Sequence, residues 1–233
     1  DIRQGKKNNI CFSSLSGKDG KWMKNTLIYI SPDEHVCECC KPNIDVQDKK
    51  VAIMYRNWLN GSRDLYLMTS DNAGKTFNKA QKLGFGTWKL NGCPMDGGGI
   101  RIDNKHMIHT TWQREGTIFY CNPNESEINL IKGKACSIAV DKTNSKELLI
   151  NMQDGSYVKI IDLNSKKEII VGKGIFLKSI LSPDGKVLCV WEQDKNIKFI
   201  MISFGMLLNK IQKLISELKP SNLTLITDFL PYA

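Results

Sequence analysis

The residues best suited to chemistry are four cysteines, Cys37, Cys39 and Cys40 in one short run and Cys93 further along the chain. Four thiolates match the ligand count of a structural zinc site. A zinc ribbon, however, has two Cys-x-x-Cys knuckles, whereas the near pair here is Cys-x-Cys with Cys40 adjacent. Neighbouring side chains point apart in an extended chain. We therefore favour a disulfide between Cys93 and one member of the triplet, with no metal ion and no cofactor. A metal site and free thiols are the alternatives.

A tight hairpin turn is predicted directly after the apolar strand at 65–68. Its key positions are Ser70, Asn72, Gly74, Thr76 and Phe77. Serine and asparagine side chains can bond to the backbone two residues on, and glycine supplies a positive φ. Thr76 and Phe77 then begin the next strand, and we expect the Phe77 ring to fold over the turn.

This turn resembles the Asp box of sialidase-like repeats, Ser-x-Asp-x-Gly-x-Thr-Trp/Phe. Ser70, Gly74, Thr76 and Phe77 match the box, and Asn72 stands where the family usually has Asp. A Cys-x-Cys-Cys-x-Pro element before the turn and a Trp-x-x-x-Gly-Cys-Pro element after it are similar to a bacterial group of these proteins, over about 60 residues. The resemblance implies a β-propeller in which the box joins the third and fourth strands of a blade, away from the catalytic face.

The same resemblance implies the chemistry of a sialidase. Such an enzyme grips the substrate carboxylate with three arginines, and it uses a tyrosine activated by a glutamate as nucleophile and an aspartate as acid/base. The candidates for these roles are Arg56, Arg63, Arg114, Asp64, Tyr55 and Glu115. The Arg-Ile-Pro element expected near the first arginine is absent, so surface ion pairs and a buried phenol are the alternative roles of these residues.

An internal repeat supports the same fold without reference to any family. A short apolar strand, an Asp-centred turn and a second apolar strand recur at 44–55, 99–112, 137–152 and 179–191. The turns are about 40–55 residues apart, which is the period of four-stranded propeller blades. The sequence therefore predicts an all-β fold over residues 1–203, a whole or partial β-propeller of about four to six blades.

The C-terminal segment has a different pattern. Apolar residues recur at helical spacing from Leu207 to Leu218, and Pro220 ends the pattern. We expect residues 204–233 to be an amphipathic helix and a tail that pack on the propeller. A helix that binds a partner or a membrane surface is the alternative.

Charge and hydropathy exclude some classes of partner. The chain has 33 Lys+Arg against 24 Asp+Glu, but the lysines are scattered through turns, which argues against a nucleic-acid partner. No apolar run reaches the length of about 18 residues that a membrane span needs. No signal peptide is visible. The cysteines and the family resemblance nevertheless favour an exported, periplasmic or extracellular protein.

Three functions are compatible with these features. The first is a sialidase-like glycoside hydrolase, exo-acting on terminal acidic sugars of glycans. The second is a non-catalytic propeller that binds a glycan or protein partner on its loop face. The third is a degenerate paralogue without activity. Convergence of three arginines at the central axis would distinguish the first from the second, and nothing in the sequence indicates an oligomeric state.

Overall fold

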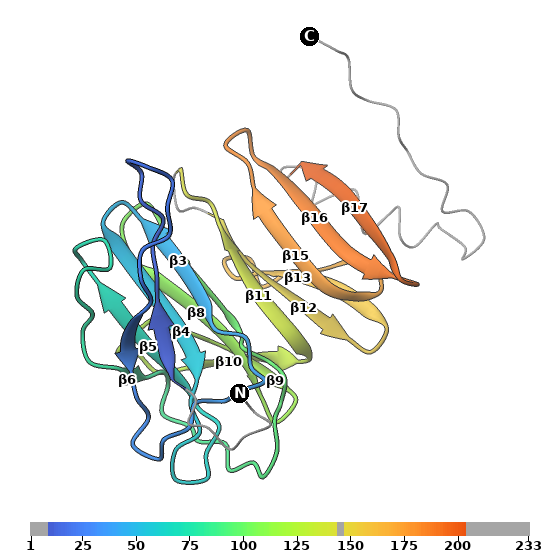
Figure 1. Cartoon of the computed structure of the whole chain (residues 1–233). Coiled ribbons are helices and arrows are strands. Elements are labelled where there is room, and N and C mark those ends of the chain that lie inside the picture. The colour runs from blue at the N-terminus through green and yellow to red at the C-terminus, as the bar shows by residue number, and fades with distance from the viewer. Residues whose placement is uncertain (1–8, 144–146, 204–233) are drawn as a thin grey trace, which may run out of the picture.

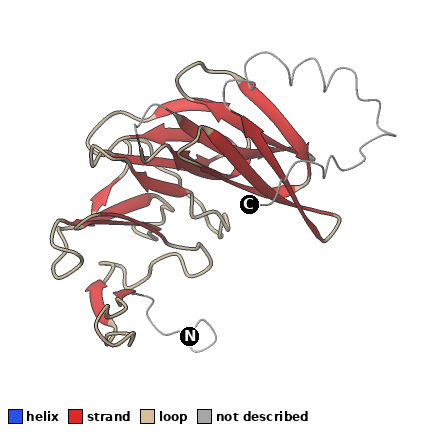
Figure 2. Cartoon of the chain, turned by 90° about the horizontal axis from the view of Figure 1, so that it is seen from above, coloured by secondary structure: helices blue, strands red, loops and turns tan. Residues whose placement is uncertain are grey.

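The computed structural model describes residues 9–143 and 147–203 of the chain (Figure 1). Within these ranges the chain forms strands and loops only, as Figure 2 shows, and it contains no helix that could cross a membrane. The helix expected in residues 204–233 lies outside the described ranges.

Four antiparallel sheets follow one another along the chain, and each is a meander in which consecutive strands pair. We call them blades 1 to 4. Blade 1 contains β3 (Asn43–Gln47), β4 (Lys50–Arg56), β5 (Leu65–Ser70) and β6 (Gln81–Lys82). Blade 2 contains β7 (Gly99–Ile102), β8 (Ile108–Arg114), β9 (Thr117–Cys121) and β10 (Ile128–Lys132). Blade 3 contains β11 (Lys134–Val140), β12 (Leu148–Asp154), β13 (Tyr157–Asp162) and β14 (Glu168–Lys173). Blade 4 contains β15 (Ile175–Leu181), β16 (Lys186–Gln193) and β17 (Asn196–Ser203).

A separate hairpin precedes the blades and packs on the first of them. It consists of β1 (Ile10–Phe12) and β2 (Thr26–Tyr29), which pair antiparallel. Ile10 of the hairpin shares an apolar cluster with Val51, Ile53 and Met68 of blade 1. The hairpin therefore covers one face of blade 1.

The blades pack face to face, as in a propeller. The first strands of successive blades, β3, β7, β11 and β15, lie next to one another in that order. Three apolar clusters fill the spaces between successive blades, and Met54, Ile118 and Val187 are examples of their buried members. Figure 1 shows the blades succeeding one another from blue at the left to orange at the right. The predicted all-β propeller is confirmed, with four strands in each of blades 1 to 3 and three described strands in blade 4.

The repeat in the sequence corresponds to the first hairpin of each blade. The four copies are β3–β4, β7–β8, β11–β12 and β15–β16. In the second and third copies the aspartate bonds to the backbone of its own turn. Asp103 Oδ1 accepts hydrogen bonds from the backbone N–H groups of Lys105 and Met107, both at 2.8 Å. Asp141 Oδ1 accepts one from Thr143 N at 2.8 Å in the next copy. This side-chain-to-backbone bonding explains Asp in these two turns.

Candidate functional site

The predicted Asp-box turn lies between β5 and β6, the third and fourth strands of blade 1. Ser70 Oγ accepts a hydrogen bond from Gly74 N, and Asn72 Oδ1 accepts one from Thr76 N, both at 2.9 Å. Asn72 Nδ2 also donates to Thr76 Oγ1 at 2.8 Å. Asn72 thus makes the backbone bond expected of the family's Asp. The Phe77 ring packs edge-on against Phe12 of the hairpin, with ring centroids 5.2 Å apart.

The four cysteines gather where blade 1 meets blade 2. Cys39 is joined to Cys93 by a disulfide, so Cys93 pairs with a member of the triplet as the sequence favours. The Sγ atoms of Cys37 and Cys40 are hydrogen-bonded to each other at 2.9 Å, and each lies 3.6 Å from Cys93 Sγ. The four sulfurs all lie within 4.8 Å of one another.

The expectation that the neighbouring cysteines would point apart is wrong. The loop before β3 turns at the triplet, and Cys40 N donates to Cys37 O at 3.4 Å. This turn brings Cys37 and Cys40 together as a Cys-x-x-Cys pair, with Cys39 beside them. The Cys-x-x-Cys spacing of Cys37 and Cys40 is present in the sequence, beside the Cys-x-Cys spacing of Cys37 and Cys39. The hydrogen bond between the two thiols lowers the pKa of Cys37 and raises that of Cys40.

Arg56 lies beside this cluster and is almost fully buried, with 1% of its surface exposed. Its guanidinium donates to three backbone carbonyls, at 2.8 Å to Asp96, 2.5 Å to Arg63 and 3.1 Å to Gln113. These carbonyls come from three separate segments at the junction of blades 1 and 2. Arg56 therefore links the loop between β4 and β5, the loop between β6 and β7, and strand β8 through hydrogen bonds.

The other two predicted arginines are also engaged. Arg114 forms a two-pronged ion pair with Glu127 and lies 4.1 Å from the centre of the Phe119 ring. Arg63 is buried, lies 3.9 Å from the centre of the Trp58 ring, and approaches Glu38 to 3.8 Å. Its Nε and Nη1 have no hydrogen-bond partner in the part of the chain that the structure describes.

The structure brings Arg56, Arg63, Arg114 and Asp64 together around one gap between blades 1 and 2. The gap has no room for a water molecule. Asp64 is held by Thr87 Oγ1 at 2.6 Å and by Trp88 N at 2.8 Å. The three arginines therefore converge between two blades, in a space that admits no sugar in this conformation.

Tyr55 and Glu115 are not brought together. Tyr55 lies in β4 with 1% of its surface exposed, beside Tyr29 and Tyr66, and burial raises the pKa of its phenol. Glu115 is exposed in the turn between β8 and β9, where its φ is 51°. A raised phenol pKa is unfavourable for a nucleophile, because the reactive form is the phenolate.

The substitution Tyr55→Phe tests the role of this phenol. The Tyr55 hydroxyl is buried and has no hydrogen-bond partner among the residues described. Since an unpaired buried hydroxyl is costly, we expect the substitution to leave the free energy of unfolding unchanged or to raise it by up to about 1 kcal/mol. Urea denaturation followed by tryptophan fluorescence measures the change. A loss of more than about 2 kcal/mol would show instead that the hydroxyl is bonded.

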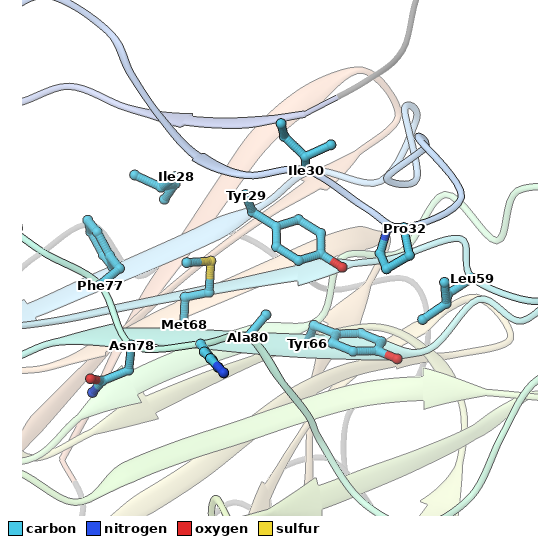
Figure 3. Close-up of a pocket in the computed structure, with 11 residues that line it drawn as sticks. Ile28, Tyr29, Ile30, Pro32, Leu59, Tyr66, Met68, Phe77, Asn78 and Ala80 are labelled. Carbon is cyan, nitrogen blue, oxygen red and sulfur yellow. The ribbon is translucent and has the colours of Figure 1, made fainter.

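An open pocket that sequence reasoning missed lies between the hairpin and blade 1 (Figure 3). Its volume is about 500 Å³. The rings of Tyr29, Tyr66 and Phe77 border it, and Asn78 and Lys79 are exposed at its edge. Its walls come from β2, β5 and the loop after the Asp-box turn, so no pattern within one segment of the sequence predicts the pocket. Tyr66, the single aromatic residue of β5, was the available signal.

Comparisons with known proteins find similarity in structure only. No protein-family model matches the chain, and no curated protein matches it. An α-L-arabinofuranosidase from Podospora anserina, solved with cellotriose, is 13% identical with a TM-score of 0.43, over 71% of this chain and 64% of that one. An α-L-arabinofuranosidase catalytic domain from Coprinopsis cinerea is 9% identical with a TM-score of 0.45, over 74% and 67%. An exo-β-1,3-galactanase from Phanerochaete chrysosporium, solved with galactose, is 9% identical with a TM-score of 0.45, over 82% and 51%. The chain thus spans less than two thirds of the first and third of these proteins, and similarity at this level does not bear on activity.

Proposed function

We propose that the chain is a non-catalytic β-propeller of the sialidase-like type that binds a glycan in the pocket bordered by Tyr29, Tyr66 and Phe77. The observation that carries the proposal is the pocket itself, whose volume of about 500 Å³ lies within the range usual for small-ligand sites. The sequence analysis allows a propeller that binds a glycan but names no residues for the binding site, and this pocket supplies candidates.

The lining of the pocket suits a sugar ring. One face of a pyranose is made of C–H groups, and aromatic side chains offer a large, rigid apolar surface to such a face. Tyr29 and Tyr66 are half-buried, so their rings are held by the protein on one side and face the pocket on the other (Figure 3). Asn78 and Lys79 at the edge supply an amide and an ammonium group for sugar hydroxyls.

Binding of glycans to the Tyr66→Ala variant tests the proposal. We expect the wild-type chain to retain one or more members of a glycan array, and isothermal calorimetry with the best ligand to give a dissociation constant for comparison. Loss of the Tyr66 ring should weaken binding about 10- to 100-fold, because burying an aromatic side chain contributes about 1.5–3 kcal/mol.

Tyr157→Ala is the matched control for that experiment. Tyr157 lies on β13 with 40% of its surface exposed, far along the chain from the pocket. Its removal should leave the dissociation constant unchanged. Equal losses in the two variants, or wild-type protein that retains no glycan on the array, would contradict the proposal.

A sialidase-type hydrolase is the second candidate, and one observation favours it. Arg56, Arg63 and Arg114 border the same gap with Asp64, although this gap lies between blades 1 and 2, whereas the resemblance implies convergence at the central axis. Hydrolysis of a fluorogenic sialoside measures this activity directly. Turnover by the wild-type chain that disappears in Arg63→Lys would favour the hydrolase, whereas we expect no turnover above that of a buffer blank.

We also propose that the protein is exported. The Cys39–Cys93 disulfide supports this, because disulfides persist in oxidising compartments. Fractionation of the producing cell, followed by detection of the chain with an antibody, tests it.

A further inference from the structure

The cysteine cluster of Cys37, Cys39, Cys40 and Cys93 holds more sulfur than one disulfide uses. Cys37 and Cys40 are buried free thiols, and their Sγ atoms lie 3.6 Å from Cys93 Sγ. All four Sγ atoms lie within 4.8 Å of one another.

The spacing of the sulfurs is close to that of a four-thiolate metal site. A tetrahedral zinc ion with four Zn–S bonds of about 2.3 Å places its sulfurs about 3.8 Å apart. Two of the distances in the cluster, from Cys93 to Cys37 and to Cys40, are 3.6 Å. The 2.9 Å contact between Cys37 and Cys40 has to widen by about 1 Å, and the bond between Cys39 and Cys93 has to be broken.

The backbone around the cluster is arranged to receive thiolates. Met95 N donates to Cys93 Sγ at 3.3 Å. Hydrogen bonds from N–H groups to sulfur stabilise the charged form of a thiol and orient it toward a metal.

Two buried guanidinium groups balance the charge of such a site. A zinc ion with four thiolates has a net charge of −2, and a buried charge is tolerated only when it is compensated. Arg56 and Arg63 are both buried at the junction of blades 1 and 2, where the cysteine cluster lies. Arg63 Nε and Nη1 are buried and have no hydrogen-bond partner among the described residues, and the nearest printed charge is the Glu38 carboxylate, 3.8 Å from Nη1.

We propose that Cys37, Cys39, Cys40 and Cys93 bind one Zn²⁺ ion as a tetrahedral four-thiolate site once the Cys39–Cys93 disulfide has been reduced. The reductant is a dithiol. It transfers two electrons to the Cys39–Cys93 bond, becomes a disulfide itself, and leaves four protein thiols. Zn²⁺ then displaces four protons, so that the sum is protein disulfide with two thiols, dithiol and Zn²⁺ giving the zinc–thiolate protein, oxidised dithiol and four H⁺.

The two states would hold the same two loops together. In the oxidised state the disulfide joins the loop before β3 to the loop between β6 and β7. In the reduced state four Zn–S bonds would join them instead. The site therefore exchanges one cross-link for another according to redox conditions, and this conclusion does not depend on glycan binding.

Metal binding by the reduced full-length chain tests the proposal. The chain is reduced with a dithiol, freed of it by anaerobic gel filtration, and titrated with Co²⁺, whose tetrahedral thiolate complexes absorb strongly. We expect one Co²⁺ per chain with a four-thiolate spectrum, its displacement by one equivalent of Zn²⁺, and no binding by the oxidised chain. A spectrum of octahedral or three-thiolate cobalt, or zinc bound equally by the oxidised chain, would overturn the proposal.

Variants separate the ligands from other cysteines. Cys37→Ser should lower zinc affinity at least about 100-fold, and Arg63→Met about 10-fold, since outer-shell partners typically contribute 10- to 100-fold. Cys189→Ser removes a buried free thiol in β16 and should leave affinity unchanged. If Cys37→Ser does not fold, alkylation of the reduced wild-type chain decides. Zn²⁺ should protect these four cysteines from the alkylating agent, and equal labelling with and without zinc would contradict the site.

Discussion

Replacing Arg56 by methionine is expected to lower the free energy of unfolding by about 3–5 kcal/mol. The side chain is 1% exposed, and its guanidinium satisfies the carbonyls of Asp96, Arg63 and Gln113. Methionine fills a similar volume but leaves three buried acceptors unpaired, each at a cost of about 1–3 kcal/mol before relaxation. Urea denaturation followed by circular dichroism measures the loss, provided that the dependence of the unfolding free energy on urea concentration is the same in both proteins.

Two controls show whether the loss arises from hydrogen bonding. Arg56→Lys keeps the charge but cannot reach three carbonyls with its single ammonium group, so it should be destabilised nearly as much. Lys49→Met, in the exposed turn between β3 and β4, should change the free energy of unfolding by less than about 0.5 kcal/mol. A loss below about 1 kcal/mol in Arg56→Met would mean that water replaces the guanidinium at these carbonyls.

Gly74→Ala is expected to lower the free energy of unfolding by about 2–4 kcal/mol. Gly74 has a φ of 79°, which is unfavourable for alanine. A Cβ at this position would also lie 2.6 Å from the Phe12 ring, so the hairpin would have to move away from blade 1. Thermal or urea unfolding measures the sum of backbone strain and collision.

Gly61→Ala separates the two causes. Gly61 has a φ of 71°, but a Cβ there would meet no atom within 4 Å. Its substitution should therefore show the backbone strain alone, about 1 kcal/mol. Combining Gly74→Ala with Phe12→Leu should recover part of the remaining loss. If Gly61→Ala and Gly74→Ala lower the free energy of unfolding equally, the collision with Phe12 does not contribute to the loss.

The features that sequence predicted well are local. The turn from Ser70 to Phe77 depends on side chains that bond to backbone within four residues, so its residue types determine its shape. The strand pairs β3–β4 and β7–β8 are likewise joined by short turns with aspartates at their centres. Period-two apolar patterns and turn residues were sufficient to place these hairpins and hence the blades.

The surroundings of the site were not predictable in the same way. The partners of Arg56 lie 7, 40 and 57 residues away, and nothing in the neighbouring sequence specifies them. The aromatic pocket forms only because the hairpin folds back on blade 1, which brings Tyr29 next to Tyr66. The clustering of Cys37 with Cys40 could have been predicted, because their Cys-x-x-Cys spacing is present in the sequence.

The disulfide encloses the whole of blade 1 within a covalent ring. Cys39 and Cys93 are 54 residues apart, and β3 to β6 all lie between them. A protease that cuts one exposed turn of this blade would therefore release no fragment, because the two halves stay attached through sulfur. Such a nicked chain would migrate as one species on a non-reducing gel and as two after reduction. A single cut in any of the other described blades would instead leave two pieces with no covalent link between them.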